Sequence, residues 1–243
     1  FTGTNSFIVG ESRVAVIDPG PPDDSHLSAL LVAIAGRPVD AIILTHTHKD
    51  HSSLAPLLKA TTGAPILFEG PHRLSRKRRF LEANLIARDC DWALVPDRTL
   101  TDNEIIAAGD VKLRVVATPG HCANHLAFGI EGRHVIFTGD HVMGWNSTLV
   151  APPDGAMAPY LASLEKLIGL PYTKYFPAHG GPISDGLGYS RALLAPRQLR
   201  NRQIDVDTGT CTRVTAETIE IDGSRTLPGD VTVIATGSAA PDW

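Results

Sequence analysis

The chain has 243 residues, 43% hydrophobic and 20% charged, and this length and composition suit one large globular domain with a sizeable core. Its net charge of −4 excludes a global basic field of the kind that recruits nucleic acid. No apolar run approaches the ~20 residues that cross a bilayer, and no signal peptide is visible, so we expect no membrane partner. Because the chain starts at Phe1 rather than Met, we expect that an upstream segment is missing. Three widely spaced cysteines argue against a disulfide framework and favour a cytoplasmic protein.

The first half of the chain alternates β-prone and helix-prone segments. We predict strands at 6–9, 13–17, 39–44 and 65–68. We predict helices at 27–35, 54–60 and 73–87, the last of them polar and mostly exposed. The first helix has Asp23, Asp24 and Ser25 as N-terminal caps and Gly36 as its end, and Ser52 and Ser53 can cap the second.

The second half continues the alternation. We predict strands at 111–117, 126–130 and 134–138, a short strand before His179, and helices at 159–168 and 189–204. Strands that alternate with helices predict an α/β fold built of layers. From residue 205 onward the chain shows short β-prone pieces separated by turns.

The segment from Thr45 to His51 is the most informative stretch, because it places three histidines and an aspartate directly after an apolar strand. The spacing is H-x-H-x-D-H, with His46, His48, Asp50 and His51 in the named positions. Neutral imidazole nitrogens and carboxylate oxygens suit zinc and similar borderline ions. The pattern therefore predicts a metal site at one edge of a sheet.

Three further candidates for metal binding follow downstream, each just past the end of a predicted strand and beside Gly or Pro. They are His121 in Thr-Pro-Gly-His, Asp140 in Phe-Thr-Gly-Asp and His179 in Pro-Ala-His-Gly. A rigid sheet positions the loops at its strand ends, and such loops often carry the chemistry of a protein.

These four motifs, in this order, resemble the metallo-β-lactamase superfamily over residues 1–204. The resemblance implies a four-layer αβ/βα sandwich in this domain, with two zinc ions in a groove at the sheet edges, although manganese or iron could take their place. It implies that the first ion is held by His46, His48 and His121. It implies that the second is held by Asp50, His51 and His179, and that Asp140 bridges the two.

The Gly139-Asp140 pair and the loop that follows it refine the resemblance. They are similar to the hydroxyacylglutathione hydrolases and to bacterial members of the β-lactamase-like protein 2 group, whereas true β-lactamases lack a bridging aspartate there. The resemblance implies a binuclear hydrolase in which a metal-bridging hydroxide attacks an ester, thioester or phosphodiester. Asp50 would orient the hydroxide and Asp140 would set the metal spacing, so both are catalytic candidates. Cleavage of β-lactams is less expected.

Three residues near these motifs are candidates for substrate contact. His125 has a second interpretation as a hydrogen-bonded support, and His141 lies in the wall of the groove or donates a proton to the leaving group. Asn146 lies with Trp145 in the following loop, where a structural role is an equal alternative. The residues expected to be only structural or on the surface are Cys122, His26, His72 and His134.

A cluster of basic residues, Arg73 with Arg76 to Arg79, could attract phosphate groups. It leaves two alternatives open: an endoribonuclease acting on single-stranded RNA, and a non-catalytic RNA-binding module. A solvated helix face is the plainer interpretation, and no aromatic platform interleaves with the cluster. The substrate is therefore expected to be a small molecule or RNA.

The tail, residues 205–243, does not fit the resemblance, which predicts a continuing helix there. Residues 230–238 are instead similar to the A-T-G strand motif of flavin-dependent disulfide-reductase-type enzymes, so a redox component is a third alternative. The chain contains no G-x-G-x-x-G fingerprint, and we expect neither flavin nor nicotinamide.

Overall fold

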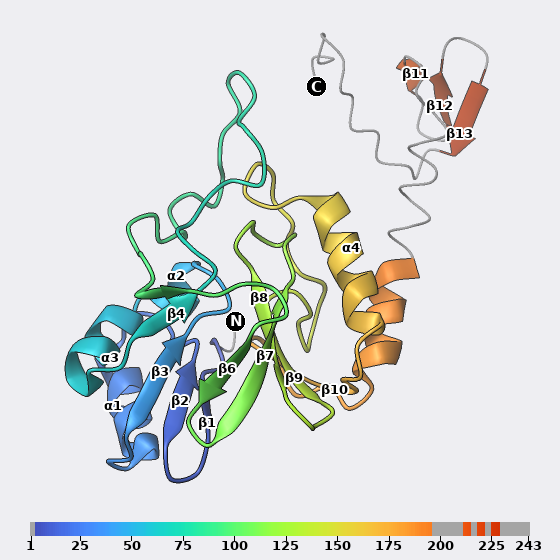
Figure 1. Ribbon diagram of the computed structural model, residues 1–243. Helices are drawn as coiled ribbons and strands as arrows, with labels where there is room; N and C mark the ends of the chain where they lie inside the picture. Colours follow the sequence, from blue (N-terminus) through green and yellow to red (C-terminus); the bar gives the residue numbers. More distant parts are fainter. Residues whose placement is uncertain (1–2, 196–210, 215–217, 222–224, 229–243) are drawn as a thin grey trace. The chain divides into compact units, whose positions relative to one another are not determined.

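A computed structural model describes residues 3–195 and, beyond them, residues 211–214, 218–221 and 225–228 (Figure 1). The chain divides into two compact units, Phe1–Leu194 and Ala195–Trp243. The strands β11 (Cys211–Val214), β12 (Thr218–Ile221) and β13 (Arg225–Pro228) of the second unit form an antiparallel sheet in that order. The A-T-G motif of the tail lies outside the described residues.

The first unit contains two five-stranded sheets. The first sheet has the order β1-β2-β3-β4-β5, in which only the β1–β2 pair is antiparallel. Its strands are β1 (Phe7–Val9), β2 (Val14–Ile17), β3 (Val39–Ile43), β4 (Ile66–Phe68) and β5 (Arg98–Thr99). The second sheet has the order β10-β9-β8-β7-β6, in which only the β9–β10 pair is parallel. Its strands are β6 (Ile105–Ala108), β7 (Val111–Ala117), β8 (Leu126–Ile130), β9 (Val135–Gly139) and β10 (Lys174–Pro177).

Helices cover the outer face of each sheet (Figure 1). One buried cluster joins the first sheet to α1 (Asp24–Ile34) and α3 (Ala55–Thr62). A second joins the other sheet to α4 (Met157–Ile168) and to the helical residues 186–195. A third cluster fills the space between the sheets. The expected four-layer αβ/βα sandwich is therefore confirmed.

The central strands are buried on both faces, as expected for strands between two apolar layers. In β2, Ala15 and Ile17 belong to the cluster between the sheets, while Val14 and Val16 belong to the cluster under the helices. All four side chains are fully buried. The same alternation continues in β3, where Ala41 and Ile43 belong to the first of these clusters and Ile42 to the second, and the chain then runs on to the short helix α2 (Lys49–Ser52).

The candidate residues for metal binding all follow strand ends. His46 and His48 follow β3, His121 follows β7, Asp140 follows β9 and His179 follows β10. Because these ends meet at one edge of the two sheets, the fold brings together side chains from four separate segments of the sequence.

The prediction of a helix at 73–87 is wrong, because these residues form turns and irregular loop. A helix in a protein depends mainly on packing one apolar face, and this segment leaves Phe80 and Leu81 exposed at 93% and 88%. The loop rises at the end of the molecule where α2 lies (Figure 1). Backbone hydrogen bonds at Ser75 and Asp89 tie it to the segment before α4 and to the start of α2.

Other helix predictions are confirmed with shifted boundaries. Asp23 caps α1 and accepts hydrogen bonds from the backbone N–H groups of Ser25 and His26. The helix expected at 54–60 is α3, but no side chain caps it; the Ser52 hydroxyl donates instead to the His48 carbonyl. The helix expected from residue 189 begins at residue 186, and residues 196–204 of it lie outside the described part of the chain. Among the described residues, no helix is both long and apolar enough to cross a membrane.

The layer between the sheets yields a stability prediction. Phe128 is fully buried there, and removing a buried aromatic ring costs about 3–5 kcal/mol. We therefore expect Phe128→Ala to lower the free energy of unfolding by this amount in urea denaturation. The matched control is Phe80→Ala in the exposed loop, which should change it by less than about 0.5 kcal/mol. Equal effects of the two substitutions would contradict the assignment of Phe128 to the core.

Candidate metal centre

The first group of donor atoms contains His46, His48 and His121. The Nε2 atoms of His46 and His121 lie 3.0 and 2.9 Å from Nδ1 of His48. Nitrogens bound to one zinc ion at 2.0–2.1 Å in tetrahedral geometry are about 3.3 Å from one another. The three rings are therefore arranged as ligands of a single cation would be.

The second group contains Asp50, His51 and His179. Oδ2 of Asp50 lies 3.4 Å from Nε2 of His51 and 3.3 Å from Nε2 of His179. Asp140 stands between the two groups: its Oδ1 is 3.4 Å from His51 and 3.3 Å from His179, while its Oδ2 is 3.6 Å from His121. One carboxylate thus presents a different oxygen to each group. The structure brings together all seven residues that the motifs predicted.

Each of the five histidine rings is held by a hydrogen bond on the nitrogen that faces away from the group. This is the usual arrangement around a metal, where an outer partner fixes the ring orientation and the tautomer. The outer partners are Thr45 Oγ1 for His46, Asp154 Oδ2 for His48, Asp18 Oδ2 for His51, the Leu149 carbonyl for His121 and the Gly3 carbonyl for His179.

Electrostatics keep both carboxylates of the centre ionised. Burial raises the pKa of Asp50, but hydrogen bonds from His179 and His51 outweigh it and hold the pKa far below its usual range. Burial likewise raises the pKa of Asp140, and the nearby His51 and His179 reverse that effect. Both groups therefore offer anionic oxygens at neutral pH.

The pKa values of His46 and His121 shift in the opposite direction from that of His179. Burial, followed by the neighbouring His48, lowers the pKa of His121 to about 4, and burial also lowers the pKa of His46. Burial lowers the pKa of His179 too, but Asp140 and Asp50 outweigh it and raise the value to about 10. His46 and His121 are thus neutral, as ligands must be, while a cation bound beside His179 would displace its proton.

The donor set fits a cation. His51 Nε2 and Asp140 Oδ1 are buried, and within the described part of the chain their polar contacts are long ones of 3.3–3.4 Å to other donors of the centre, with no hydrogen bond of ordinary geometry. Burying such atoms without partners costs free energy. A cation between them would satisfy both atoms, and the imidazole and carboxylate donors suit zinc, iron and manganese.

Glycines at two strand ends allow this close packing. Gly120 has φ of 145°, and a Cβ there would lie 2.3 Å from the Tyr160 Cα. Gly139 has φ of 51°, and a Cβ there would lie 2.7 Å from His125 Nε2. The glycines that precede His121 and Asp140 are therefore required by backbone conformation and by space.

The three candidates for substrate contact occupy different places. His125 is 1% exposed, lies 2.8 Å from Thr118 Oγ1 through Nδ1, and accepts a hydrogen bond from the Asp140 backbone N–H. His141 is buried, with its ring 4.6 Å from that of Tyr160. Asn146 is exposed in the loop before α4. The position of His125 matches the alternative of a support, here for Asp140.

Three supporting residues were not singled out from the sequence. Asp18 follows β2 with φ of 49°, unusual for a residue other than glycine, and accepts a hydrogen bond from the Thr45 backbone as well as from His51. Asp154 is fully buried beside His48. The hydroxyl of Thr4 donates to Asp50. The only sequence feature that could have identified any of these three residues is a carboxylate directly after the apolar strand β2, and it identifies Asp18 alone.

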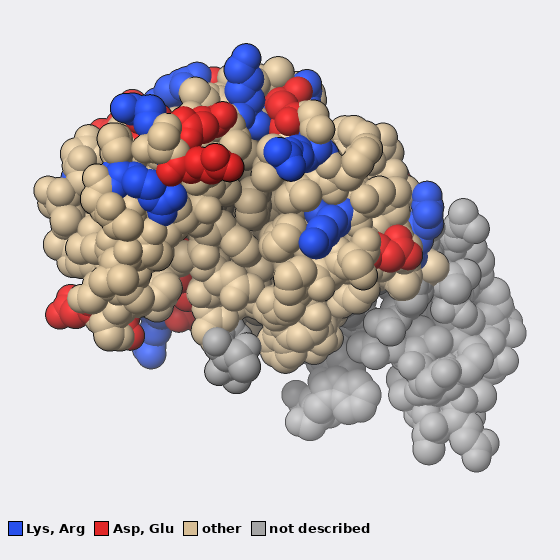
Figure 2. Space-filling view, turned by 90° about the horizontal axis from the view of Figure 1, so that it is seen from below, with Lys and Arg blue, Asp and Glu red and all other residues tan. Residues whose placement is uncertain are grey.

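The basic cluster in the loop 73–87 is partly neutralised within the chain. Arg73 pairs with Glu69, and Arg76 pairs with Glu82. The guanidinium of Arg78 donates to the Glu82 carbonyl. Figure 2 shows the molecule from below Figure 1, on the side away from this loop, and there basic and acidic side chains are interspersed.

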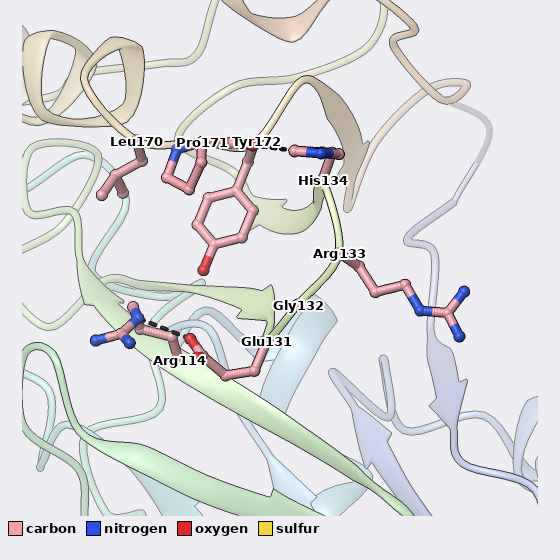
Figure 3. A pocket seen from close by; sticks show the side chains of 8 residues that line it. All are labelled: Arg114, Glu131, Gly132, Arg133, His134, Leu170, Pro171 and Tyr172. Carbon is pink, nitrogen blue, oxygen red and sulfur yellow. Dashed lines mark hydrogen bonds and ion pairs between the residues drawn. The ribbon is translucent and has the colours of Figure 1, made fainter.

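A hollow of about 310 Å³ lies elsewhere, at the hairpin between β8 and β9. Figure 3 shows Tyr172 pointing toward the Arg114–Glu131 ion pair, while His134 contacts Pro171 through the hydrogen bond drawn there. The hairpin lies at the opposite end of these strands from His125 and Asp140. The hollow is therefore separate from the candidate metal centre.

A sandwich of this type with such a cluster at its edge is typical of metal-dependent hydrolases. A family model described as the metallo-beta-lactamase superfamily matches residues 1–179, and the chain belongs to this superfamily of hydrolases. The resemblance expected from the four motifs is therefore confirmed.

Two curated relatives and one solved structure extend the comparison. The chain is 27% identical over 205 residues to the atrochrysone carboxyl ACP thioesterase dmxR1 of Cryptosporiopsis sp., covering 83% of this chain and 56% of that protein. It is 25% identical over 206 residues to a beta-lactamase-like protein 2 homolog of Caenorhabditis elegans, covering 83% and 64%. The structure of TTHA1623 in a di-iron-bound form matches with a TM-score of 0.58 and 26% identity, covering 76% and 91%. The chain spans about half to two thirds of the length of the curated relatives it matches.

Metal removal should change the stability of the protein. The donor groups come together only in the folded chain, so a bound ion stabilises folding by about 2.7 kcal/mol when free metal is 100-fold above Kd. We expect zinc to raise Tm in calorimetry and a chelator to reverse the rise. His121→Ala should weaken the response, while the control His134→Ala, at an exposed histidine, should keep it. An unchanged response in His121→Ala would contradict the assignment of His121.

The two described cysteines should be unreactive. Burial, followed by the charge of Asp154, raises the pKa of the Cys90 thiol to about 12 and raises that of Cys122 well above its usual value. In a Cys211→Ser background at pH 8, we expect iodoacetamide to label neither thiol in folded protein and both after denaturation. Rapid labelling of the folded protein would show that these thiols are accessible as thiolates.

Proposed function

We propose that the protein hydrolyses acyl thioesters with two zinc ions, one in each group of donors. The observation that carries the proposal is the position of Asp140, whose two oxygens face the two groups separately. A carboxylate that serves both groups would hold two ions at a fixed separation. Iron or manganese could replace zinc, since the donors suit all three and the similar TTHA1623 was solved with two irons.

When bound, such a pair of ions would lower the pKa of a shared water from ~15.7 toward neutrality and polarise the attacked carbonyl. Asp140 would set the spacing of the two groups, held in place by the hydrogen bond from its backbone to His125. Asp50 stays anionic and has a side chain 37% exposed, so it can accept a hydrogen bond from an attacking water. Thr4 fixes the orientation of that carboxylate.

Leaving-group chemistry favours a thioester over RNA. A thiol has a pKa of about 8.5, so a thiolate can depart without a proton donor from the protein. The ribose oxygen that leaves in RNA cleavage is far more basic and needs one. The nearby candidates His125 and His141 are both at most 1% exposed, and neither can reach a substrate as placed.

The name of one relative supports the same choice. That relative is named as an atrochrysone carboxyl ACP thioesterase. Cleavage of single-stranded RNA is the second candidate, favoured by the basic loop, although three of its five basic side chains are bonded within the chain. The non-catalytic RNA-binding module and β-lactam hydrolysis rank lower, the latter because of Asp140.

A turnover assay on metal-loaded protein tests the proposal. We expect hydrolysis of S-lactoylglutathione or an acyl-N-acetylcysteamine, and none of single-stranded RNA or a chromogenic cephalosporin. Asp140→Asn should lower kcat/KM by at least about 100-fold, because charge stabilisation by bound metals is worth several kcal/mol. The same substitution at exposed Asp24 should have no effect.

RNA cleavage that Asp140→Asn abolishes, without thioester turnover, would replace the proposal with the endoribonuclease. RNA affinity that survives both chelation and Asp140→Asn, in a protein with no turnover, would favour the binding module. Thioester turnover that survives Asp140→Asn would show that the reaction occurs elsewhere.

A further inference from the structure

His48 differs from the other four histidines of the centre in its orientation. The others turn Nε2 inward and are held through Nδ1. His48 turns Nδ1 inward, 3.0 Å from His46 Nε2, and points Nε2 to the outside of the group. The hydrogen bond that fixes the His48 ring must therefore be made at Nε2, on the side of the ring away from the other donors.

Asp154 supplies that support from a distant part of the chain. Its Oδ2 lies 3.2 Å from His48 Nε2, across 106 positions of sequence, and the residue is fully buried. Its backbone is held as well, because the hydroxyl of Ser75 donates to its carbonyl at 2.6 Å. A buried carboxylate is costly unless each oxygen has a partner, so this placement requires a second donor.

His72 is the second donor. Its Nε2 lies 2.7 Å from Asp154 Oδ1, and its Nδ1 lies 2.9 Å from Thr47 Oγ1. Asn124 in turn donates to the same Thr47 oxygen at 2.8 Å. No spacing in the sequence predicts a partner for His72, yet His72 is only 6% exposed and completes a closed set of contacts around His48.

These contacts indicate which atoms around His72 donate hydrogen bonds and which accept them. A carboxylate only accepts hydrogen bonds, so His72 must carry its hydrogen on Nε2 and His48 must also donate through Nε2 to Asp154. His72 Nδ1 then accepts from the Thr47 hydroxyl. His48 is left with a lone pair on Nδ1, which is the atom that faces His46 and His121.

We propose that Asp154 and His72 are positioning residues that fix the ring and tautomer of His48, and so set the metal affinity of the group formed by His46, His48 and His121. Neither residue touches the donor atoms of the second group. The effect of changing them should therefore fall on one of two ions. The inference rests on the proposed function only in assuming that this group binds metal.

The test measures metal affinity and needs no substrate. Zinc is withdrawn from each variant by a competing chelator, and the two dissociation constants are compared with those of the wild type. Loss of an outer partner to a metal-binding histidine costs about 10–100-fold in affinity. We expect Asp154→Asn to weaken one ion by that factor, leave the other unchanged, and shift the visible spectrum of the cobalt-loaded protein. Asp24→Asn is the matched control.

A second pair of variants covers the case in which Asp154→Asn does not fold. His72→Gln keeps a donor near the position of Nε2, whereas His72→Ala removes it. We expect His72→Gln to retain close to wild-type affinity at both sites and His72→Ala to weaken one of them. Equal affinities in the two variants, or equal weakening of both ions together with a lower Tm of the metal-free protein, would overturn the proposal. Inactivity toward thioesters would leave this result intact, so the two proposals fail separately.

Discussion

The site depends on confining seven imidazole and carboxylate groups at one edge of the sheets, where most of them are removed from water. Six of these residues are buried. Their inward-facing polar atoms lie mainly against one another. Such confinement is unfavourable without compensation. Hydrogen bonds on the outer nitrogens of the histidines offset part of this free-energy cost. A cation bound by the inward-facing donors would offset the rest.

The two sheets contribute different halves of the site. The loop after β3, in the first sheet, carries His46, His48 and His51, whereas His121, Asp140 and His179 follow strands of the second. The apolar layer between the sheets therefore sets the distance between the two halves. Close packing in that layer transmits small displacements, which links core packing directly to the geometry of the donors.

The sequence was sufficient for the fold and for the seven residues that the structure brings together, because both depend on short local patterns. Strand ends next to Gly, such as Gly120 before His121, can be recognised without any long-range contact. The outer partners of His48 cannot be recognised in this way. Asp154 and His72 lie far from His48 in sequence, and only the packing of the segment before α4 against the loop at residue 72 brings them together.

The error at residues 73–87 has the same origin. The composition of that segment suits a polar helix, but helix formation there required an apolar surface to pack against, and the fold provides none. Its ends are fastened beside the site, and its large apolar side chains face solvent. The backbone hydrogen bonds at Ser75 and Asp89, rather than local helix propensity, therefore determine the conformation of this segment.

Exposure indicates where a substrate can approach. Of the two carboxylates in the centre, Asp50 is 37% exposed and Asp140 only 8%. The open side therefore belongs to the second group of donors.

Two exposed apolar side chains lie beside the donors. Trp145, which lies against the glycine that follows His179, is 57% exposed, and Leu149, whose carbonyl holds His121, is 58% exposed. Large apolar side chains next to anchored donors suit a substrate with an apolar acyl portion, whereas a polyanion would gain little from them. The surroundings of the donors thus favour the same class of substrate as the leaving-group chemistry.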